Sequence, residues 1–303
     1  MTHRPARARR TVLSVPASSD RFIDKSRHLA VDQVFLDLED GVAAAAKDDA
    51  RARAVAALRA GGWTAPTVSV RVNGWATVWT HRDVIDVVTG AGDLLDTVLL
   101  PKVEGPGHVE ALDLLLTQLE RAAGLEVGRI GIEALIEDAG ALVRADAIAA
   151  SSPRLEALHL GPGDMMAALG MPSLQVGGLV DGYPGDALHH VYGRILVAAR
   201  ARGLQAVDGP YVAVRDEDGF RAAARRAAAL GYDGKWVLHP AQVAAGTEIF
   251  TPDDETVARA EAMVAVAARA ADERVGAVML DDEMVDEAGV SLAKATLARV
   301  RRT

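Results

Sequence analysis

The stretch VFLDLEDGV, residues Val34–Val42, joins an apolar strand to a cluster of acids. Its apolar first half is typical of a strand that is buried on both faces of a sheet. Glu39 and Asp40 follow at the end of this strand, and Gly41 comes next. Asp37 lies two residues before Glu39 and so shares its side of the strand; we expect it to be a buried structural acid. Because like charges repel, the cluster predicts a cation or a polar ligand beside it.

The same pattern, a short apolar run and then an alanine-rich helical stretch, repeats along the chain. Eight strands that alternate with helices over about 240 residues predict a (β/α)8 TIM barrel, an α/β fold. A doubly wound open sheet is the alternative, but the turn VPASSDR after the first strand lacks the glycines of a dinucleotide-binding turn. The expected strands are 11–15, 33–38, 67–72, 96–100, 129–136, 155–160, 204–207 and 235–238, and the expected helices are 21–30, 44–60, 80–89, 108–123, 138–150, 187–202 and 218–230.

The pattern changes after Pro240. A long helix is expected over Thr251–Ala271, with Thr251 as its N-cap and acids in its first turn. A small hairpin or turn and a last helix follow. The sequence thus predicts a barrel domain over residues 1–250 and a C-terminal extension or lid over 251–303, which we expect to reach a neighbouring subunit.

The composition excludes several classes of function. Half of the 303 residues are apolar and the net charge is −9, which disfavours a general nucleic-acid binder or a protein of anionic membranes. The chain has no cysteine, and therefore no disulfide or thiolate metal site. No stretch approaches the roughly 20 apolar residues of a membrane span. The basic start, MTHRPARARR, is interpreted as a frayed tail, and we expect a cytoplasmic protein.

Polar residues gather where the predicted strands end. In a barrel these carboxyl ends meet at one rim, where active sites lie. Acids outnumber bases there, and an oxygen-only set of ligands suits Mg2+ or Mn2+. Glu137 and Asp164 follow neighbouring strands and can hold such an ion together with water and substrate oxygens. The acids of this rim are Glu39, Asp40, Glu137, Asp164 and Asp208, and the bases are Arg71 and Lys102.

Each of these residues also has a purely structural interpretation. Glu137 is equally consistent with an acid in the first turn of a helix, where the helix dipole favours it. Asp164, in GPGDMMAALG, is consistent with an N-cap. Arg71 ends an apolar run, which is costly unless the side chain is paired or binds an anion. It can pair with Glu39 or Asp40, or it can polarise a substrate carbonyl or hold a substrate carboxylate.

Seven motifs occur in order along nearly the whole chain: RRTVLSVPASSDRFIDKS, VFLDLEDGV with Lys47 and Arg51 after it, VRVNG, LLPKVE, IEALIEDAGAL, LHLGPGDMMAALG and GYDGKWVLHPAQV. Together they resemble the citrate lyase β-subunit family, also called the HpcH/HpaI aldolase family, and within it the CoA-ester lyases of the malyl-CoA lyase type. Two positions depart from the pattern. Leu135 stands where a glutamine is expected, and Leu160 where a phenylalanine is expected; both changes leave the acids in place.

The resemblance implies roles for the residues of the rim. Glu137 and Asp164 match the Mg2+ ligands. Arg71 matches the arginine that contacts the substrate and stabilises developing enolate charge. Glu39 and Asp40 match an acidic pair beneath the metal, which orients the arginine and the waters of the ion.

The resemblance also implies a site for coenzyme A and a residue from a second chain. Arg21 and Lys25, and less directly Arg10, match the positions that hold the CoA phosphates. Asp286, in EMVDEA, matches an aspartate that enters the active site of a neighbouring subunit. Its alternative interpretation is a solvated helix N-cap. A homotrimer or homohexamer is the family's usual assembly.

The implied reaction is a reversible Claisen-type cleavage of a β-hydroxyacyl-CoA. Malyl-CoA, β-methylmalyl-CoA or citramalyl-CoA would give acetyl-CoA or propionyl-CoA together with glyoxylate or pyruvate. Three alternatives stay open. One is a metal-dependent aldolase of free 2-oxo acids, which leaves Arg21 and Lys25 without a role. Another is a malyl-CoA thioesterase or a malate synthase-like enzyme, which releases free CoA. The third is a non-catalytic barrel that binds an acyl-CoA.

Overall fold

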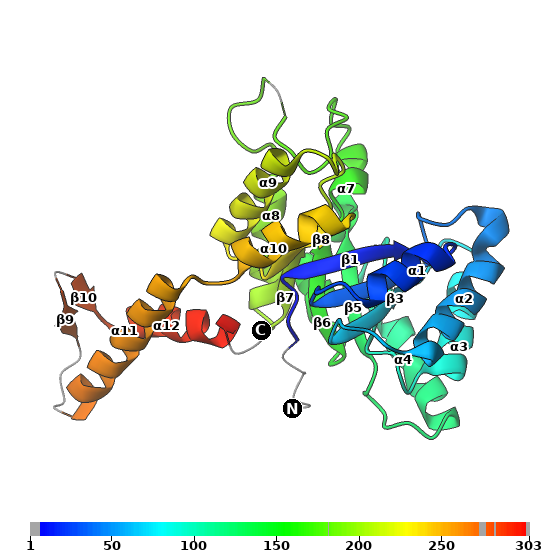
Figure 1. The fold of residues 1–303 in the computed structure, drawn as a ribbon, viewed down its shortest axis with the longest axis horizontal. Coiled ribbons are helices and arrows are strands. Elements are labelled where there is room, and N and C mark those ends of the chain that lie inside the picture. Colours follow the sequence, from blue (N-terminus) through cyan, green and yellow to red (C-terminus); the bar gives the residue numbers. More distant parts are fainter. Residues whose placement is uncertain (1–6, 181, 273–276, 282, 301–303) are drawn as a thin grey trace.

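Eight parallel strands close into a barrel in the order β1 to β8, with β8 paired to β1 (Figure 1). This computed structural model describes residues 7–180, 182–272, 277–281 and 283–300. The closed barrel confirms the expected fold class. The strands are β1 (Thr11–Pro16), β2 (Gln33–Asp37), β3 (Thr67–Arg71), β4 (Thr97–Leu100), β5 (Gly131–Ile136), β6 (Leu155–Leu160), β7 (Gln205–Asp208) and β8 (Gly234–Val237).

The strands are buried on both faces, as their continuous apolar runs predict. Their outward side chains pack beneath the helices in one large apolar cluster. Seven of their inward side chains form a separate apolar layer inside the barrel: Val12, Phe35, Leu99, Leu135, Ala157, Val207 and Trp236. This layer closes the barrel below the rim, so a ligand can approach the strand ends only from outside.

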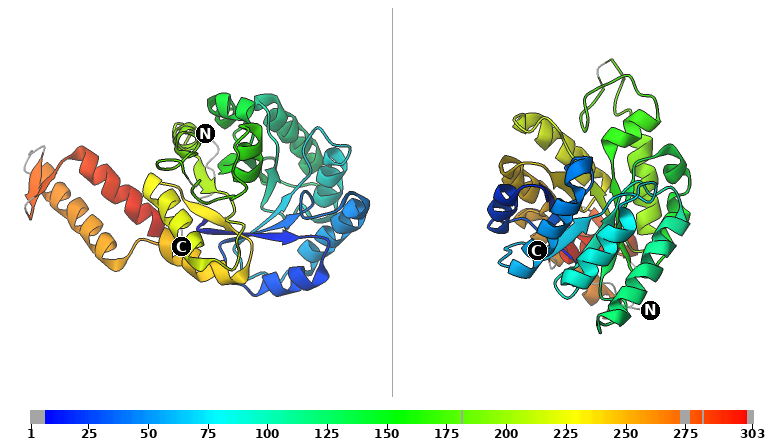
Figure 2. Two further views of the ribbon diagram at one scale, coloured as in Figure 1. Left: turned by 90° about the horizontal axis from the view of Figure 1, so that it is seen from above. Right: turned by 90° about the vertical axis from the view of Figure 1, so that its right-hand side faces the viewer.

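Helices surround the barrel (Figure 2). Local sequence starts several of them: the Ser19 side chain accepts a hydrogen bond from Phe22 N, and Asp216 accepts one from Gly219 N. The helices of the barrel are α1 (Asp20–Arg27), α2 (Lys47–Ala60), α3 (Thr80–Ala91), α4 (Pro106–Ala122), α5 (Ala139–Val143), α6 (Ala145–Ala149), α7 (Pro162–Ala168), α8 (His189–Arg200), α9 (Glu217–Leu230) and α10 (Val243–Phe250).

Three helical expectations were wrong in detail. The helix expected over 138–150 is divided into α5 and α6 at Arg144, whose backbone leaves helical geometry with ψ at 12°. The short helices α7 and α10 were not expected. Thr251 is not the N-cap of the long helix, because it ends α10 and lies three residues before α11, which begins at Asp254. Asp253 has that role instead, and its carboxylate accepts a hydrogen bond from Thr256 N.

The C-terminal extension contains α11 (Asp254–Asp272), an antiparallel pair of strands, β9 (Val278–Leu280) and β10 (Glu283–Val285), and α12 (Glu287–Val300). This confirms the expected hairpin and last helix. The extension projects away from the barrel (Figures 1 and 2). It starts at the amino ends of the strands, where Arg10, just before β1, donates a hydrogen bond to the Thr251 side chain. Among the described residues, no helix is long and apolar enough to cross a bilayer.

Candidate active site

Arg71, the last residue of β3, lies at the centre of the rim. Its Nε and Nη2 atoms donate to Asp37 Oδ1 and Oδ2, both at 2.7 Å. Asp37 is the last residue of β2, and the β2–β3 register sets it beside Arg71. Both side chains are almost fully buried. Burial alone would lower the pKa of Arg71, but the charge and hydrogen bonds of Asp37 raise it above its usual value, so the guanidinium stays charged.

Asp37 therefore does more than the structural role expected for it. We expected Glu39 and Asp40 to orient Arg71. Glu39 does lie 2.8 Å from Arg71 Nη1, but Asp40 is 3.8 Å from it and half exposed. The two-point pair with Asp37 is the stronger contact. Sequence alternation predicted on which side of the strand Asp37 lies, but only the pairing of β2 with β3 identifies its partner.

Lys102 connects the acids that follow β2, Glu39 and Asp40, to Glu137 and Asp164, which follow β5 and β6. Its Nζ atom lies 2.5 Å from Glu39 Oε1, 3.6 Å from Asp40 Oδ1 and 3.9 Å from Asp164 Oδ1. Its backbone N–H donates to Glu137 Oε1 at 2.6 Å. To make both contacts, Lys102 adopts a left-handed backbone with φ of 50°, a strained conformation for a residue with a side chain. Lys102 was expected among the bases of the rim, but the sequence around it does not indicate that it contacts acids from several strand ends.

A second buried network fixes the loop that carries Glu39. Lys47 Nζ donates to the carbonyl oxygens of Leu38 and Glu39, both at 2.7 Å. Asn73 Nδ2 donates to Leu38 O as well, and Asp83 accepts from both nitrogens of Asn73. Together these hydrogen bonds fix the backbone carbonyl groups of Leu38 and Glu39. Lys47 occurs in one of the motifs, but its partners are visible only in the fold.

Glu137 and Asp164 come from neighbouring strand ends, as expected. Glu137 directly follows β5 and is nearly fully buried, whereas Asp164 lies in the first turn of α7 after β6 and is half exposed. Neither is an N-cap: Asp138 caps α5, and Gly161 precedes α7. Burial, with the charges of Asp164 and Glu39, raises the pKa of Glu137 to about 7. A cation bound beside Glu137 would favour the ionised form of its carboxyl and lower its pKa.

The residues present fit a magnesium ion. The described residues contain no cluster of three or more acids and histidines that would enclose a metal. Magnesium, however, is usually held by one or two carboxylates and completes its shell with water and substrate oxygens. Gly161 keeps the space beside Glu137 open, since a Cβ atom there would lie 2.3 Å from Glu137 Oε2. The pair of Glu137 and Asp164 is thus an open, oxygen-only site.

The three cations expected to hold CoA phosphates are not brought together. Arg21 and Lys25 are exposed on α1, one turn apart, and α1 begins just after the rim end of β1. Arg10 precedes β1, about 20 Å from that rim at about 3.3 Å per residue. It forms a two-point pair with Asp32 and also donates to Thr251. Arg10 is therefore a structural residue of the opposite end of the barrel.

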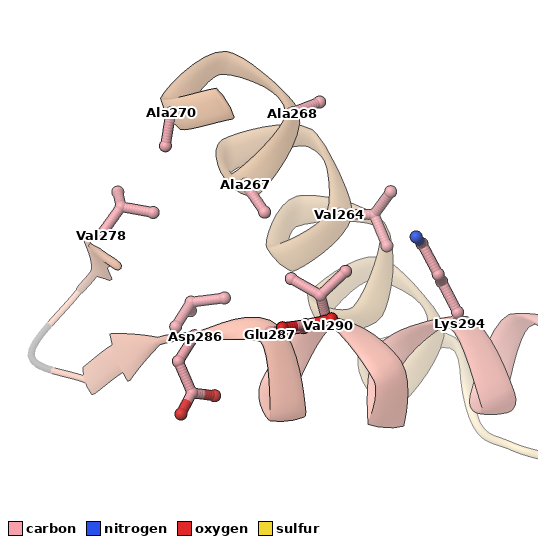
Figure 3. Close-up of a pocket in the computed structure, with 10 residues that line it drawn as sticks. Val264, Ala267, Ala268, Ala270, Val278, Asp286, Glu287, Val290 and Lys294 are labelled. Atoms are coloured by element: carbon pink, nitrogen blue, oxygen red, sulfur yellow. The ribbon is translucent and has the colours of Figure 1, made fainter. Parts of the chain in front are cut away.

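Asp208 has different surroundings from those expected at the rim, and Asp286 occupies the position of its alternative interpretation. Asp208, at the end of β7, is fully buried and pairs with Lys235 Nζ at 2.6 Å. It also accepts a hydrogen bond from the Tyr192 hydroxyl, so it faces the helices rather than the rim. Asp286 directly precedes α12 and accepts a hydrogen bond from Gly289 N, as its N-cap interpretation predicts. Asp286 is exposed, and it lines a hollow together with Val264 and Ala267 (Figure 3).

Asp286 cannot reach the rim of its own chain in this arrangement. The extension leaves the barrel at the end opposite to Arg71, and its last helix returns to that same end, where Arg299 donates to Gly231 O. Gly231 precedes β8, at the amino end of the strand. Asp286 therefore lies far from the rim residues of its own chain.

Known proteins resemble this chain over nearly its full length. An L-malyl-CoA/beta-methylmalyl-CoA lyase of Cereibacter sphaeroides is 39% identical over 299 residues, which cover 96% of this chain and 94% of that protein. A (3S)-malyl-CoA thioesterase of the same organism is 33% identical, with coverage of 96% and 94%. The crystal structure of CitE from Mycobacterium tuberculosis, in complex with magnesium, acetoacetate and coenzyme A, is 31% identical, covers 96% of this chain and 97% of CitE, and superposes with a TM-score of 0.74.

The family model described as HpcH/HpaI aldolase/citrate lyase matches residues 10–240, which extend from the start of β1 to the end of β8. This range includes five of the seven quoted motifs in full, nearly all of the first and last, and the whole acidic rim. The resemblance seen in the sequence is thereby confirmed, and the chain belongs to the HpcH/HpaI aldolase/citrate lyase family.

Proposed function

We propose that this protein is a Mg2+-dependent CoA-ester lyase that cleaves a carbon–carbon bond in a β-hydroxyacyl-CoA, reversibly. The products are acetyl-CoA or propionyl-CoA and a 2-oxo acid, glyoxylate or pyruvate. The observation that carries the proposal is the pair Glu137 and Asp164, which Lys102 and Glu39 connect to the buried cation of Arg71. Lyase relatives that align over 96% of the chain support the same reaction class.

Glu137 and Asp164 are the proposed metal ligands. Mg2+, with Mn2+ as the alternative, supplies Lewis-acid polarisation of the substrate's hydroxyl and carboxylate oxygens when bound. Glu39, Asp40 and Lys102 surround this position, and the ammonium of Lys102 balances part of the negative charge. The two proposed ligands can therefore take up a divalent cation while the remaining acids keep their protein partners.

Arg71 is the proposed stabiliser of the negative charge that develops when the bond breaks. Cleavage leaves the thioester fragment as an enolate, whose oxygen accepts a hydrogen bond from a guanidinium N–H. Asp37 occupies Nε and Nη2 and thereby fixes the plane of the guanidinium. Because this pair is formed before the substrate arrives, the donor does not have to be reorganised during the reaction.

Asp286 of a neighbouring copy is the proposed proton carrier. In cleavage the substrate hydroxyl loses its proton as the carbon–carbon bond breaks, and Asp286 gives a proton to the enolate carbon; in condensation Asp286 removes a proton from that carbon and the new hydroxyl takes one up. The extension, residues 251–303, would bring it to the rim of another chain. A homotrimer or homohexamer in a cytoplasmic setting completes the proposal, because a closed ring gives every active site one extension.

Arg21 and Lys25 are the proposed contacts for the CoA phosphates. Both are exposed cations near the rim, and a phosphate accepts hydrogen bonds from either. Arg10 is omitted from this group because Asp32 occupies its guanidinium. A free 2-oxo acid aldolase would have no use for these two side chains.

A substrate panel tests the proposal. Malyl-CoA, β-methylmalyl-CoA and citramalyl-CoA are incubated with the protein and Mg2+, and 2-oxo acid, acyl-CoA and free CoA are each measured. The expected result is equal amounts of 2-oxo acid and acetyl- or propionyl-CoA from at least one substrate. Absence of 2-oxo acid from all three would overturn the lyase proposal.

A second candidate is thioester hydrolysis, which the similarity to a (3S)-malyl-CoA thioesterase favours. In that case water attacks the thioester carbonyl and the same panel gives free CoA in place of acyl-CoA. A lyase followed by hydrolysis would give free CoA together with the 2-oxo acid. The time course distinguishes them, since acetyl-CoA then accumulates before free CoA.

A further inference from the structure

Arg71 rests on two aromatic rings inside the barrel. Its Cζ atom lies 5.4 Å from the centroid of the Trp236 ring and 5.7 Å from that of Phe35. The two rings pack against each other at 4.6 Å with an angle of 54° between their planes. A cation over the face of tryptophan at such a distance is attracted by the electron-rich ring, and more strongly where water is excluded. We call Phe35 and Trp236 the aromatic floor of Arg71.

A hydrogen bond inside the barrel fixes the orientation of the Trp236 indole. Its indole Nε1–H donates to His159 Nδ1 at 2.8 Å, and His159 Nε2 lies 2.6 Å from Glu133 Oε2. An indole can only donate, so His159 Nδ1 must accept and the ring hydrogen must be on Nε2. Burial lowers the pKa of His159, which agrees with a neutral imidazole. The chain of donors therefore runs in one direction, from Trp236 through His159 to Glu133.

Glu133 anchors this chain at the amino end of the barrel. Its other oxygen accepts from Arg9 at 3.1 Å and from Thr97 Oγ1 at 2.7 Å. Glu133, His159 and Arg9 have no more than 1% of their surface exposed. Burial alone would raise the pKa of Glu133, but the charge of Arg9 and the hydrogen bond of His159 lower it, so the acid is ionised.

A purely structural core would have no need for these groups. Buried ions and imidazoles are costly to desolvate, and apolar residues of similar volume fill such a space at least as well. The remaining members of the inner layer are aliphatic apart from Phe35. The polar chain ends at the one ring nitrogen that sets the orientation of the Trp236 indole beneath Arg71.

We propose that Trp236, locked by His159 and Glu133, is a positioning residue for Arg71. Asp37 fixes the edge of the guanidinium, and the aromatic floor fixes its face, so that the N–H groups keep one direction toward the substrate. The kinetic consequence rests on the proposed lyase function, whereas the positioning itself does not. The role is specific to Trp236, because it alone connects the guanidinium to the polar chain below.

Kinetics with matched variants form the first arm of the test. Trp236→Leu removes the ring and should lower kcat about tenfold with little change in the KM for the CoA ester. Trp236→Phe keeps a ring beneath Arg71 but lacks the N–H that His159 accepts, so its kcat should lie between those of the wild type and Trp236→Leu. Phe220→Leu removes a fully buried aromatic side chain on α9, outside the barrel, and controls for lost packing. Equal losses of kcat in the Trp236→Leu and Phe220→Leu proteins would overturn the proposal.

A double-mutant cycle asks whether Trp236 acts through Arg71. Arg71→Lys abolishes the two-point pair and the stacked plane. The effect of Trp236→Leu on kcat should then be much smaller in the Arg71→Lys background than in the wild type. Equal effects in both backgrounds would mean that Trp236 does not act through Arg71.

The polar chain has its own pair of variants. Glutamine can accept from the indole and donate to Glu133, whereas leucine can do neither. His159→Gln should therefore retain more kcat than His159→Leu. The reverse order would contradict the assigned direction of the chain.

A spectroscopic arm requires no turnover. The Nε–H proton of Arg71, identified by its loss in Arg71→Lys, should have a ring-current shift that decreases in Trp236→Leu, where only Phe35 remains, and is unchanged in Phe220→Leu. If the wild-type protein cleaves no substrate but this shift behaves as described, the lyase proposal fails and the positioning stands. An unchanged shift in Trp236→Leu overturns the positioning.

Discussion

Asp37 and Arg71 form a two-point ion pair at the rim, with each of two guanidinium nitrogens 2.7 Å from a different carboxylate oxygen. The same carboxylate accepts the backbone N–H groups of Glu39 and Gly41. One buried acid thus fixes both the central cation and the loop of the acidic cluster. Burial alone would raise the pKa of Asp37, but Arg71 lowers it below its usual range, so the acid stays ionised.

Asp37→Asn should therefore damage both activity and stability. The amide cannot accept at both ends, which leaves the buried guanidinium with an incomplete set of partners. We expect kcat to fall at least about a hundredfold, and urea unfolding to show a loss of about 3 kcal/mol. Asp40→Asn is the matched control, because Asp40 is half exposed and 3.8 Å from Arg71. Similar losses in both variants would show that Asp37 has no special role.

Glu137→Gln and Asp164→Asn should abolish stabilisation by magnesium. A bound ion raises the melting temperature, because it binds the folded state alone. The wild type should melt at a higher temperature in millimolar Mg2+, and each variant should lose most of that increase. Glu110→Gln, an exposed acid on α4, should respond to Mg2+ as the wild type does. A full Mg2+ response in either variant would remove that residue from the metal site.

The Mg2+ response should also depend on pH. Burial first, and the nearby carboxylates second, raise the pKa of Glu137 from 4.5 to about 7 in the metal-free protein. Since the folded protein holds this proton more tightly than the unfolded chain, Glu137 reduces stability progressively as the pH rises from 4.5 through 7. Only the carboxylate binds the metal, so the increase in melting temperature should be larger at about pH 8 than at about pH 6.

Glu137→Gln provides the control for this dependence. Glutamine does not titrate, so any remaining pH effect on the Mg2+ response belongs to other groups. An equal response at the two pH values in the wild type would contradict the assignment to Glu137.

Asp286 can be tested separately from its role as a helix cap. Serine also caps α12 by accepting from Gly289 N, but it cannot exchange the proton. Asp286→Ser should therefore fold with nearly wild-type stability, bind the CoA ester and lose at least about a hundredfold in kcat. Mixing refolded Asp286→Ser and Glu137→Gln subunits should restore part of the activity, because some sites then combine two intact halves. Failure of the mixture, with mixed oligomers present, would argue against a shared site.

Arg21→Ala and Lys25→Ala should weaken binding of the CoA ester without affecting the chemical step. Each should raise the KM about fivefold to tenfold and leave kcat unchanged, and added salt should reduce the difference. Arg121→Ala removes an exposed cation at the other end of the barrel and is the control. An unchanged KM in the double variant would favour an enzyme of free 2-oxo acids.

Local sequence was sufficient to predict the elements of the barrel. Continuous apolar runs specify strands that are buried on both faces, and alanine-rich amphipathic stretches specify the helices around them. The pairing of β8 with β1 confirms the barrel that this alternation predicts. Boundaries failed where capping competes with helical spacing: Arg144 ends one short helix, and Asp253 replaces Thr251 as the cap of α11.

The residues of the candidate site were also largely visible in the sequence, because the carboxyl ends of parallel strands meet at one rim whatever the loops do. Arg71, Glu39, Glu137 and Asp164 do gather there. Asp208 and Arg10 have partners that the sequence did not predict, for a common reason. A position at a strand end specifies neither the direction of a side chain nor its partner. Asp208 pairs with Lys235 beneath the helices, and Arg10 pairs with Asp32 at the amino end of the barrel.

The sequence by itself determined the family, the barrel and the set of acids, since these depend on local patterns and on motifs in a fixed order. Only the tertiary structure decided how VFLDLEDGV is used. Its Asp37 binds Arg71, its Glu39 bridges Arg71 and Lys102, and its Phe35 supports the guanidinium from inside the barrel. Each of these partners is more than 30 residues away. The register of neighbouring strands brings them together, and that register depends on closure of the whole barrel.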